Sequence, residues 1–197
     1  MTNLPLEMLA KAMTYESYAS LFDRVVAEKS TTGPNQSEDY VHYTELNWHR
    51  FKRVNKTFHV AQESEEIIAA LAPQTWVLLT ETWCGDAAHS VPVIAKIAEC
   101  NPKISLQILL RDENLPLMDL FLTNGGRSIP KLIICEGEDL QIRADWGPRP
   151  EALQNDFLRM KNEQVEFEAI KIHSQNWYNS DKGKSIVSEV INLLINQ

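Results

Sequence analysis

The stretch Glu81-Thr82-Trp83-Cys84-Gly85-Asp86-Ala87 joins two patterns that predict regular structure. Before it, residues 76–80 (WVLLT) form the short apolar run of a buried strand, and after it residues 92–98 belong to a helix that starts near Cys84. Cys84 is therefore expected at a helix N-terminus. Unpaired backbone N–H groups and the helix dipole favour a thiolate there, so we expect Cys84 to be exposed and reactive.

Strand and helix patterns alternate through the rest of residues 75–160. We expect a second buried strand, a helix, a hairpin of two strands and a last helix at residues 104–110, 117–122, 131–135, 140–146 and from Pro150 onwards. This order predicts an α/β fold, with a mixed central sheet and helices on both of its faces.

Helical patterns flank this core on both sides. On the N-terminal side we expect helices over residues 6–29, 38–56 and 63–71, with a short strand at 57–61, and on the C-terminal side an amphipathic helix over 186–194. The predicted organisation is a helical extension at residues 1–56, the central domain at 57–160, and a second helical extension at 161–197 packed on the same domain.

The composition is that of a globular chain that does not enter a membrane. Of its 197 residues 44% are hydrophobic and 23% charged, and the net charge of −8 offers no overall basic field for nucleic acid or anionic lipid. No apolar run is long enough to cross a bilayer, and the first residues lack the layout of a signal peptide. Three cysteines are too few for a disulfide scaffold, so we expect a cytoplasmic protein.

Four features together resemble the thioredoxin superfamily over about half of the chain: Trp83-Cys84-Gly85, Pro92 eight residues after the cysteine, Ile129-Pro130 before a strand, and Gly147 after the hairpin. The resemblance implies a thioredoxin-like fold in which Pro130 follows a cis peptide bond and faces Cys84. It also implies a substrate groove, whose residues would be Trp83, Gly85, Asp86, Ile129, Pro130 and Gly147.

The chain departs from the superfamily pattern at two positions. Ala87 stands where thioredoxins carry their second cysteine, and Leu78 stands where they carry a buried aspartate. The sequence resembles the single-cysteine subgroup with Trp-Cys-Gly-Asp-Ala. Cys100 lies roughly 24 Å along the same helix, at about 1.5 Å per residue. Cys135 lies roughly 16 Å from Pro130 along a strand. Both are expected as small buried side chains, and the chemistry is left to Cys84.

The charge of Asp86 opposes a thiolate on Cys84, because both would be negative. Arg127, three residues before Pro130, would offset it across the groove; the alternative is that Arg127 is a solvated loop residue. Cys84 itself has a purely structural alternative, as a buried thiol without chemistry.

His89 and Asp86 share a helical face, but two candidate ligands are a poor set for zinc, and we expect no metal and no cofactor. The basic and aromatic residues 48–53 are better explained as a helix with a packed and a solvated face than as a nucleic-acid site.

The function predicted from these residues is thiol–disulfide exchange through Cys84 alone. Its partner would be a protein disulfide or a low-molecular-weight thiol, with no nucleic acid and no membrane involved. The alternative is a thioredoxin-fold binding module that has lost redox turnover, which Ala87 and Leu78 favour. The oligomeric state does not follow from the sequence.

Overall fold

The computed structural model describes residues 3–195. Four strands form one sheet in the order β2-β1-β3-β4, made of β1 (Gln74–Thr80), β2 (Ile104–Leu110), β3 (Lys131–Glu136) and β4 (Gln141–Trp146). β1 runs parallel to β2 and antiparallel to β3, and β3 pairs antiparallel with β4. The predicted mixed sheet and all four of its strands are confirmed.

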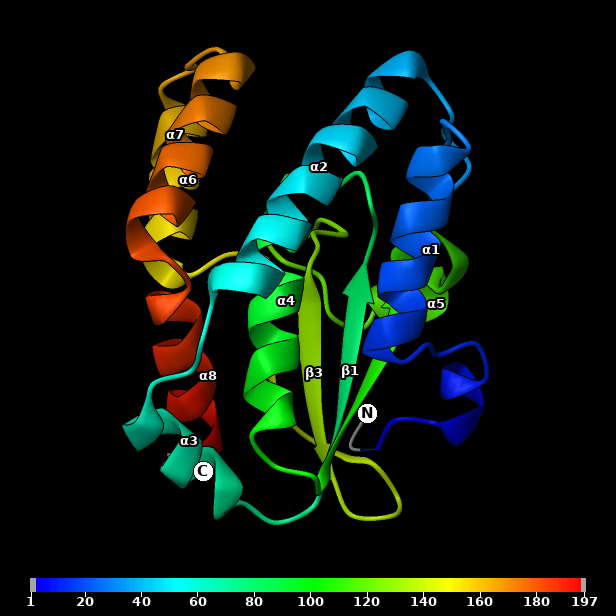
Figure 1. Cartoon of the computed structure of the whole chain (residues 1–197), viewed down its shortest axis with the longest axis vertical. Coiled ribbons are helices and arrows are strands. Elements are labelled where there is room, and N and C mark those ends of the chain that lie inside the picture. The colour runs from blue at the N-terminus through cyan, green and yellow to red at the C-terminus, as the bar shows by residue number, and fades with distance from the viewer. Residues whose placement is uncertain (1–2, 196–197) are drawn as a thin grey trace.

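Helices cover both faces of this sheet and extend beyond it (Figure 1). In chain order they are α1 (Tyr15–Ala27), α2 (Glu38–Thr57), α3 (Gln62–Ala69), α4 (Gly85–Glu99), α5 (Leu115–Met118), α6 (Glu151–Asn162), α7 (Phe167–Asp181) and α8 (Lys184–Ile195). The α/β fold with helical extensions predicted from the sequence is therefore confirmed. No helix within residues 3–195 is both long and apolar enough to cross a membrane.

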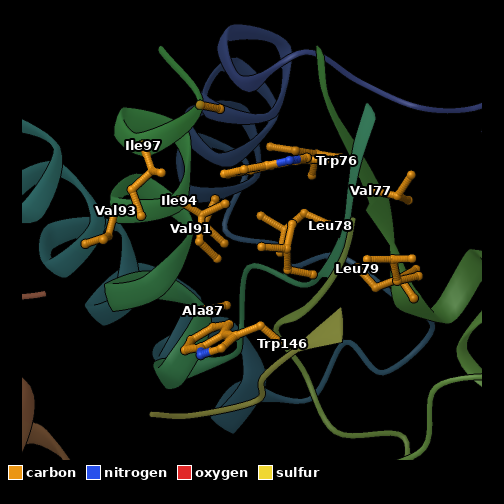
Figure 2. Packing of buried hydrophobic residues seen from close by; sticks show 14 of the residues in the cluster. Trp76, Val77, Leu78, Leu79, Ala87, Val91, Val93, Ile94, Ile97 and Trp146 are labelled. Atoms are coloured by element: carbon orange, nitrogen blue, oxygen red, sulfur yellow. The ribbon is translucent and has the colours of Figure 1, made fainter. Parts of the chain in front are cut away.

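The core lies between β1 and α4 (Figure 2). Trp76 and Leu78 point from the strand toward α4, where Val91 and Ile94 face them, while Val77 and Leu79 point to the opposite side of the sheet. All six side chains are fully buried. A strand buried on both faces explains why its sequence is continuously apolar rather than alternating.

Two local predictions for the N-terminal extension are wrong. Residues 6–29 are a short 3-10 helix (Leu6–Leu9) followed by α1, because Met13 is extended and exchanges two backbone hydrogen bonds of 2.8 Å with Ile108 at the edge of β2. The Thr14 side chain then caps α1 by accepting from the Ser17 backbone N–H. Residues 57–61 form no strand, because α2 continues to Thr57, where the Phe58 N–H still donates to the Val54 carbonyl oxygen, and residues 58–61 only connect α2 to α3.

The end of β4 approaches the start of β3 at Gly147. This glycine has φ +112°, and a Cβ atom there would lie 2.2 Å from the Pro130 carbonyl oxygen. Both the backbone conformation and the lack of space require glycine.

Gly147→Ala should therefore lower the free energy of unfolding by at least about 2 kcal/mol more than Gly125→Ala. Gly125 is the matched control, since it also has a positive φ (+76°) but no atom within 4 Å of the position that an alanine Cβ would take. Urea unfolding of the two variants measures the difference. Equal losses would show that Gly147 is needed only for its backbone angle, and that the Pro130 contact costs nothing.

Candidate functional site

Cys84 lies where β1 passes into α4. It is the N-cap residue of α4, with its carbonyl oxygen accepting from the Ala88 N–H at 3.1 Å and its own N–H donating to the Glu81 carbonyl oxygen at 3.3 Å. The predicted position of Cys84 at a helix N-terminus agrees with the structure. Its predicted exposure does not, because only 8% of the residue is accessible.

The loop before β3 reaches the same point. The Cys84 thiol donates to the Ile129 carbonyl oxygen over 3.3 Å, and the Ile129–Pro130 peptide bond is cis. Gly147 lies against the carbonyl oxygen of Pro130. The Cys84 thiol therefore contacts the loop before β3, and Gly147 contacts the same loop at Pro130.

Burial determines the state of this thiol. The pKa of Cys84 rises from 9.0 to about 12, chiefly through burial and in addition through the nearby charge of Asp86, although the N–H groups of Ala87 and Asp86 and the charge of Arg149 act to lower it. A rise of that size corresponds to about 4 kcal/mol. A helix terminus contributes only about 0.3–1 kcal/mol at an exposed site. The predicted thiolate is therefore wrong, since the structure favours a protonated thiol at neutral pH.

Asp86 forms a buried polar cluster with two residues of the C-terminal region. Its Oδ2 lies 2.7 Å from Nη2 of Arg149, and its Oδ1 accepts from the Tyr178 hydroxyl at 3.0 Å. Burial raises the pKa of Asp86, whereas Arg149 and Tyr178 both lower it. The cluster connects α4 to the start of α6 and to α7, close to Cys84.

Arg127 does not offset the charge of Asp86. Its guanidinium makes two hydrogen bonds of 2.6 and 2.9 Å to the carboxylate of Asp119, and both side chains are exposed. Arg127 is thus a solvated loop residue, which was the alternative interpretation of this position. Arg149 supplies the cation for Asp86 instead, and its place directly after Gly147-Pro148 was the available signal in the sequence.

Helix α2 covers the other side of the site. The Tyr40 ring packs on Trp83 with 5.0 Å between centroids, and Nδ2 of Asn47 donates to the Thr82 carbonyl oxygen at 3.3 Å. Arg50 donates to Asn47 and has a guanidinium nitrogen 3.6 Å from where a Cβ of Gly85 would lie. On its far side Trp83 is covered by the guanidinium of Arg111, 4.9 Å from the ring.

Glu81 is a buried carboxyl group that sequence reasoning did not single out. It has no accessible surface, and its Oε1 accepts from the Asp112 backbone N–H at 2.8 Å. Within residues 3–195 its Oε2 has no hydrogen-bond partner. Burial raises the pKa of Glu81 from 4.5 to about 7, against the lowering effect of the Asp112 N–H. An acidic residue directly after a fully apolar strand was the available signal.

The remaining cysteines and His89 lie apart from this chemistry. All three cysteines are free; Cys135 is buried in β3, and Cys100, half-buried rather than buried as expected, donates to the Lys96 carbonyl oxygen at 3.2 Å. His89 stacks on Tyr178 with 4.4 Å between centroids, and burial lowers its pKa to about 4. In the part of the chain that the structure describes, no three His, Cys, Asp or Glu side chains gather as metal ligands would.

The comparison with known families agrees with this geometry. A family model described as thioredoxin matches residues 33–165, more than half of the chain. The chain belongs to the thioredoxin family. The matched region starts before α2 and ends just after α6, so it includes the whole of the Cys84 site apart from Tyr178.

Two solved structures have a similar fold. One is a protein of unknown function from Pseudomonas aeruginosa, with a TM-score of 0.57, 13% identity, and 92% of this chain and 96% of that chain covered. The other is an HIV epitope scaffold, with a TM-score of 0.60, 11% identity and 97% of both chains covered. At these identities the likeness concerns the fold of this thioredoxin-family chain, including its extensions, and not its activity. None of the curated proteins matches the sequence.

The charge of Asp86 provides a direct test of the Cys84 environment. Asp86→Asn removes a negative charge and leaves Arg149 without its ion-pair partner, and both changes lower the pKa of Cys84. Alkylation of Cys84 by iodoacetamide at pH 8 should become about tenfold faster, as one pKa unit implies. Tyr178→Phe is the control, because it loosens the same cluster but keeps the Asp86 charge. Equal acceleration in both variants would show that access, and not charge, limits the thiol.

Glu81 should make stability depend on pH. Because its pKa is raised in the folded chain, it contributes stability fully below pH 4.5, and this contribution is lost as the pH rises to about 7. Glu81→Gln cannot ionise, so its stability relative to the native chain should rise by about 3 kcal/mol between pH 4 and pH 8.

Urea unfolding at several pH values measures this difference. Glu45→Gln, an exposed position on α2, serves as the control and should show no comparable change. A constant difference between the Glu81→Gln and native chains would mean that folding leaves the pKa of Glu81 unchanged.

Proposed function

We propose that this thioredoxin-family protein carries out thiol–disulfide exchange through Cys84 alone, with a low-molecular-weight disulfide as its partner. The Cys84 thiolate attacks one sulfur of the disulfide, so that a new S–S bond forms to Cys84 and the other sulfur leaves as a thiolate, which takes up a proton. A different small thiol, as its thiolate, then attacks the small-molecule sulfur of the mixed disulfide, so that a new disulfide forms between the two small thiols and Cys84 leaves as a thiolate, which takes up a proton. The net reaction replaces one thiol of the small disulfide by another and leaves Cys84 unchanged.

The observation that carries this proposal is the meeting of Cys84 with the Ile129–Pro130 loop. The thiol lies 3.3 Å from the Ile129 carbonyl oxygen, at the end of a helix whose Ala87 and Asp86 N–H groups lower its pKa. These N–H groups offset part of the cost of forming a thiolate here, and a partner sulfur would approach along the polar backbone of residues 129–130. Since Ala87 offers no second thiol, resolution must come from outside the chain.

Steric access favours a small partner over a protein. Cys84 is 8% exposed, and its neighbours in the chain are held by helices: α2 contacts Thr82 and Trp83, and Tyr178 of α7 donates to Asp86. An extended peptide would have to displace these helical contacts, whereas a small disulfide needs only a narrow path. A free pool of such thiols requires a reducing compartment, and the cytoplasm is the one we propose.

The raised pKa makes the proposed reaction slow at neutral pH and steep in its pH dependence. With a pKa of about 12, the thiolate is on the order of one part in 10⁵ at pH 7. The rate of exchange should therefore rise about tenfold per pH unit between pH 7 and pH 10.

A specific observation also favours the binding module as a second candidate function. The Cys84 thiol is protonated at neutral pH, donates to the Ile129 carbonyl oxygen, and is nearly inaccessible. In that role Cys84 would be a packing residue that holds the loop before β3, and the groove would bind its ligand without exchange.

Intact-mass spectrometry after incubation with 2-hydroxyethyl disulfide distinguishes the two functions. We expect one mixed disulfide per folded chain, with a rate that follows the predicted pH dependence, and removal of the adduct by 2-mercaptoethanol. Cys84→Ala should abolish the adduct, whereas the double variant Cys100→Ala/Cys135→Ala should keep it. Folded protein that forms no adduct at pH 9, although the urea-unfolded chain reacts readily, would contradict exchange and support the binding module.

A further inference from the structure

A second concave surface, which we call the α3–α8 groove, lies on the other side of Tyr178 from Asp86. Its walls come from the C-terminal half of α2, from α3, from α4 and from the α7–α8 turn with α8, and it encloses about 1010 Å³. In Figure 1, α8 starts below α7 and runs down to α3, and the connector from α2 to α3 passes beside it. This volume suits a small molecule better than a folded partner.

One wall of the groove is apolar. It is lined by aliphatic and aromatic side chains from three helices: Val54 and the C-cap residue Phe58 of α2, Ile67 of α3, and Val187 and Ile191 of α8. Ile67 is the exposed member of this wall, with 40% of the residue accessible. Phe58, Val187 and Ile191 are already buried, with 7–9% of each exposed, so a hydrocarbon body in the groove would pack against them and remove chiefly the surface of Ile67 from water.

The mouth of the groove is basic. Arg53, Lys182 and Lys184 line it, all three exposed, and within residues 3–195 none of them forms an ion pair with a carboxylate. Arg53 donates only to the neutral amide oxygen of Asn179, at 2.8 Å. In a chain of net charge −8, three cationic side chains without an ion-pair partner thus line this groove.

The α7–α8 turn places two of these charges. Lys182 and Gly183 both have left-handed backbone angles, with φ of 56° and 83°, so α7 ends and α8 begins within two residues. A Cβ on Gly183 would lie 2.9 Å from Val93 and 3.0 Å from Phe58. The turn is thus packed tightly onto the groove wall, with a lysine on each side of the glycine.

The lining of the groove contains no described acidic side chain, neither aspartate nor glutamate. Glu65 and Glu66 of α3 line a neighbouring hollow that also contains Lys96, and both carboxylate oxygens of Asp181 accept from the Ser185 backbone at the start of α8. His89, on the shared wall, is neutral at pH 7 because burial lowers its pKa to about 4.

We propose that the α3–α8 groove binds a small amphipathic carboxylate of the fatty-acid type. Its carboxylate would lie at the basic mouth, near Arg53 and the α7–α8 turn, and its aliphatic chain would run along α8 toward Ile67 and Ile191. From Lys184 to Ile191 the helix advances by about 10 Å, at about 1.5 Å per residue, which suits a medium-length chain. This site is separate from the exchange proposed for Cys84 and does not depend on it.

Isothermal titration of the native protein with decanoate tests the proposal. We expect saturable binding at one site, at least tenfold tighter than that of decyltrimethylammonium, which has the same chain and the opposite charge. Raising the salt concentration should weaken decanoate binding, because the mouth is exposed. A lack of saturable binding at millimolar decanoate, or equal affinity for the cation, would overturn the proposal.

Two pairs of substitutions locate the site. Lys182→Asn/Lys184→Ala removes the charges of the turn, and asparagine tolerates the left-handed angle at position 182. This variant should bind decanoate at least tenfold more weakly, whereas Lys103→Ala/Lys161→Ala, which removes two exposed lysines outside the groove, should stay within twofold of the native chain. Ile67→Asn should weaken binding at the apolar end. Equal losses in both lysine pairs would show nonspecific charge attraction and overturn the assignment.

Discussion

The burial of the junction between β1 and α4 is the constraint on which the site depends. The junction carries a thiol, two carboxyl groups and the free N–H groups of a helix end, and all of them lose water when α2 and α7 cover it. Desolvation outweighs the helix end and raises the pKa values of Glu81, Cys84 and Asp86 together. A carboxylate next to Cys84 must then be paired if it is to remain ionised, and Arg149 with the Tyr178 hydroxyl provides this pairing. Asp86 therefore has two effects: its charge raises the pKa of the Cys84 thiol, and its hydrogen bond to Tyr178 holds α7 beside the site.

This member of the thioredoxin family keeps the geometry around one cysteine but lacks two residues of a dithiol site. Its Cys84, its cis Ile129–Pro130 bond and its close Gly147 contact lie together, but the chain has Ala87 where a second thiol would resolve a mixed disulfide and Leu78, packed toward α4, where a buried acid would lie. The chain does have a buried acid, Glu81, but its carboxyl group accepts a hydrogen bond from the Asp112 backbone N–H. Two features that a dithiol site needs are thus missing, which is why the proposed exchange relies on an external small thiol.

Local sequence patterns determined most of the fold. The apolar runs of the four strands, the apolar stripe of α4 and the turn residues of the β3–β4 hairpin are short-range signals, so the mixed sheet and the position of Cys84 at a helix end could be predicted from them. The wrong local predictions have long-range causes. Met13 is extended because it pairs with Ile108, nearly a hundred positions along the chain, and no periodicity within residues 6–29 contains that information.

The tertiary structure alone decided the state of the site. Whether Cys84 is a thiol or a thiolate depends on how much water reaches it, and helices from distant parts of the chain pack on the residues beside it: α2 contacts Thr82 and Trp83, and α7 contacts Asp86. The partner of Asp86 was likewise decided in space, since Arg127 pairs with Asp119 while Arg149 reaches Asp86. Sequence determines which groups can ionise. Only their packing determines the solvation and the neighbouring charges, and these set the free energy of each charged form.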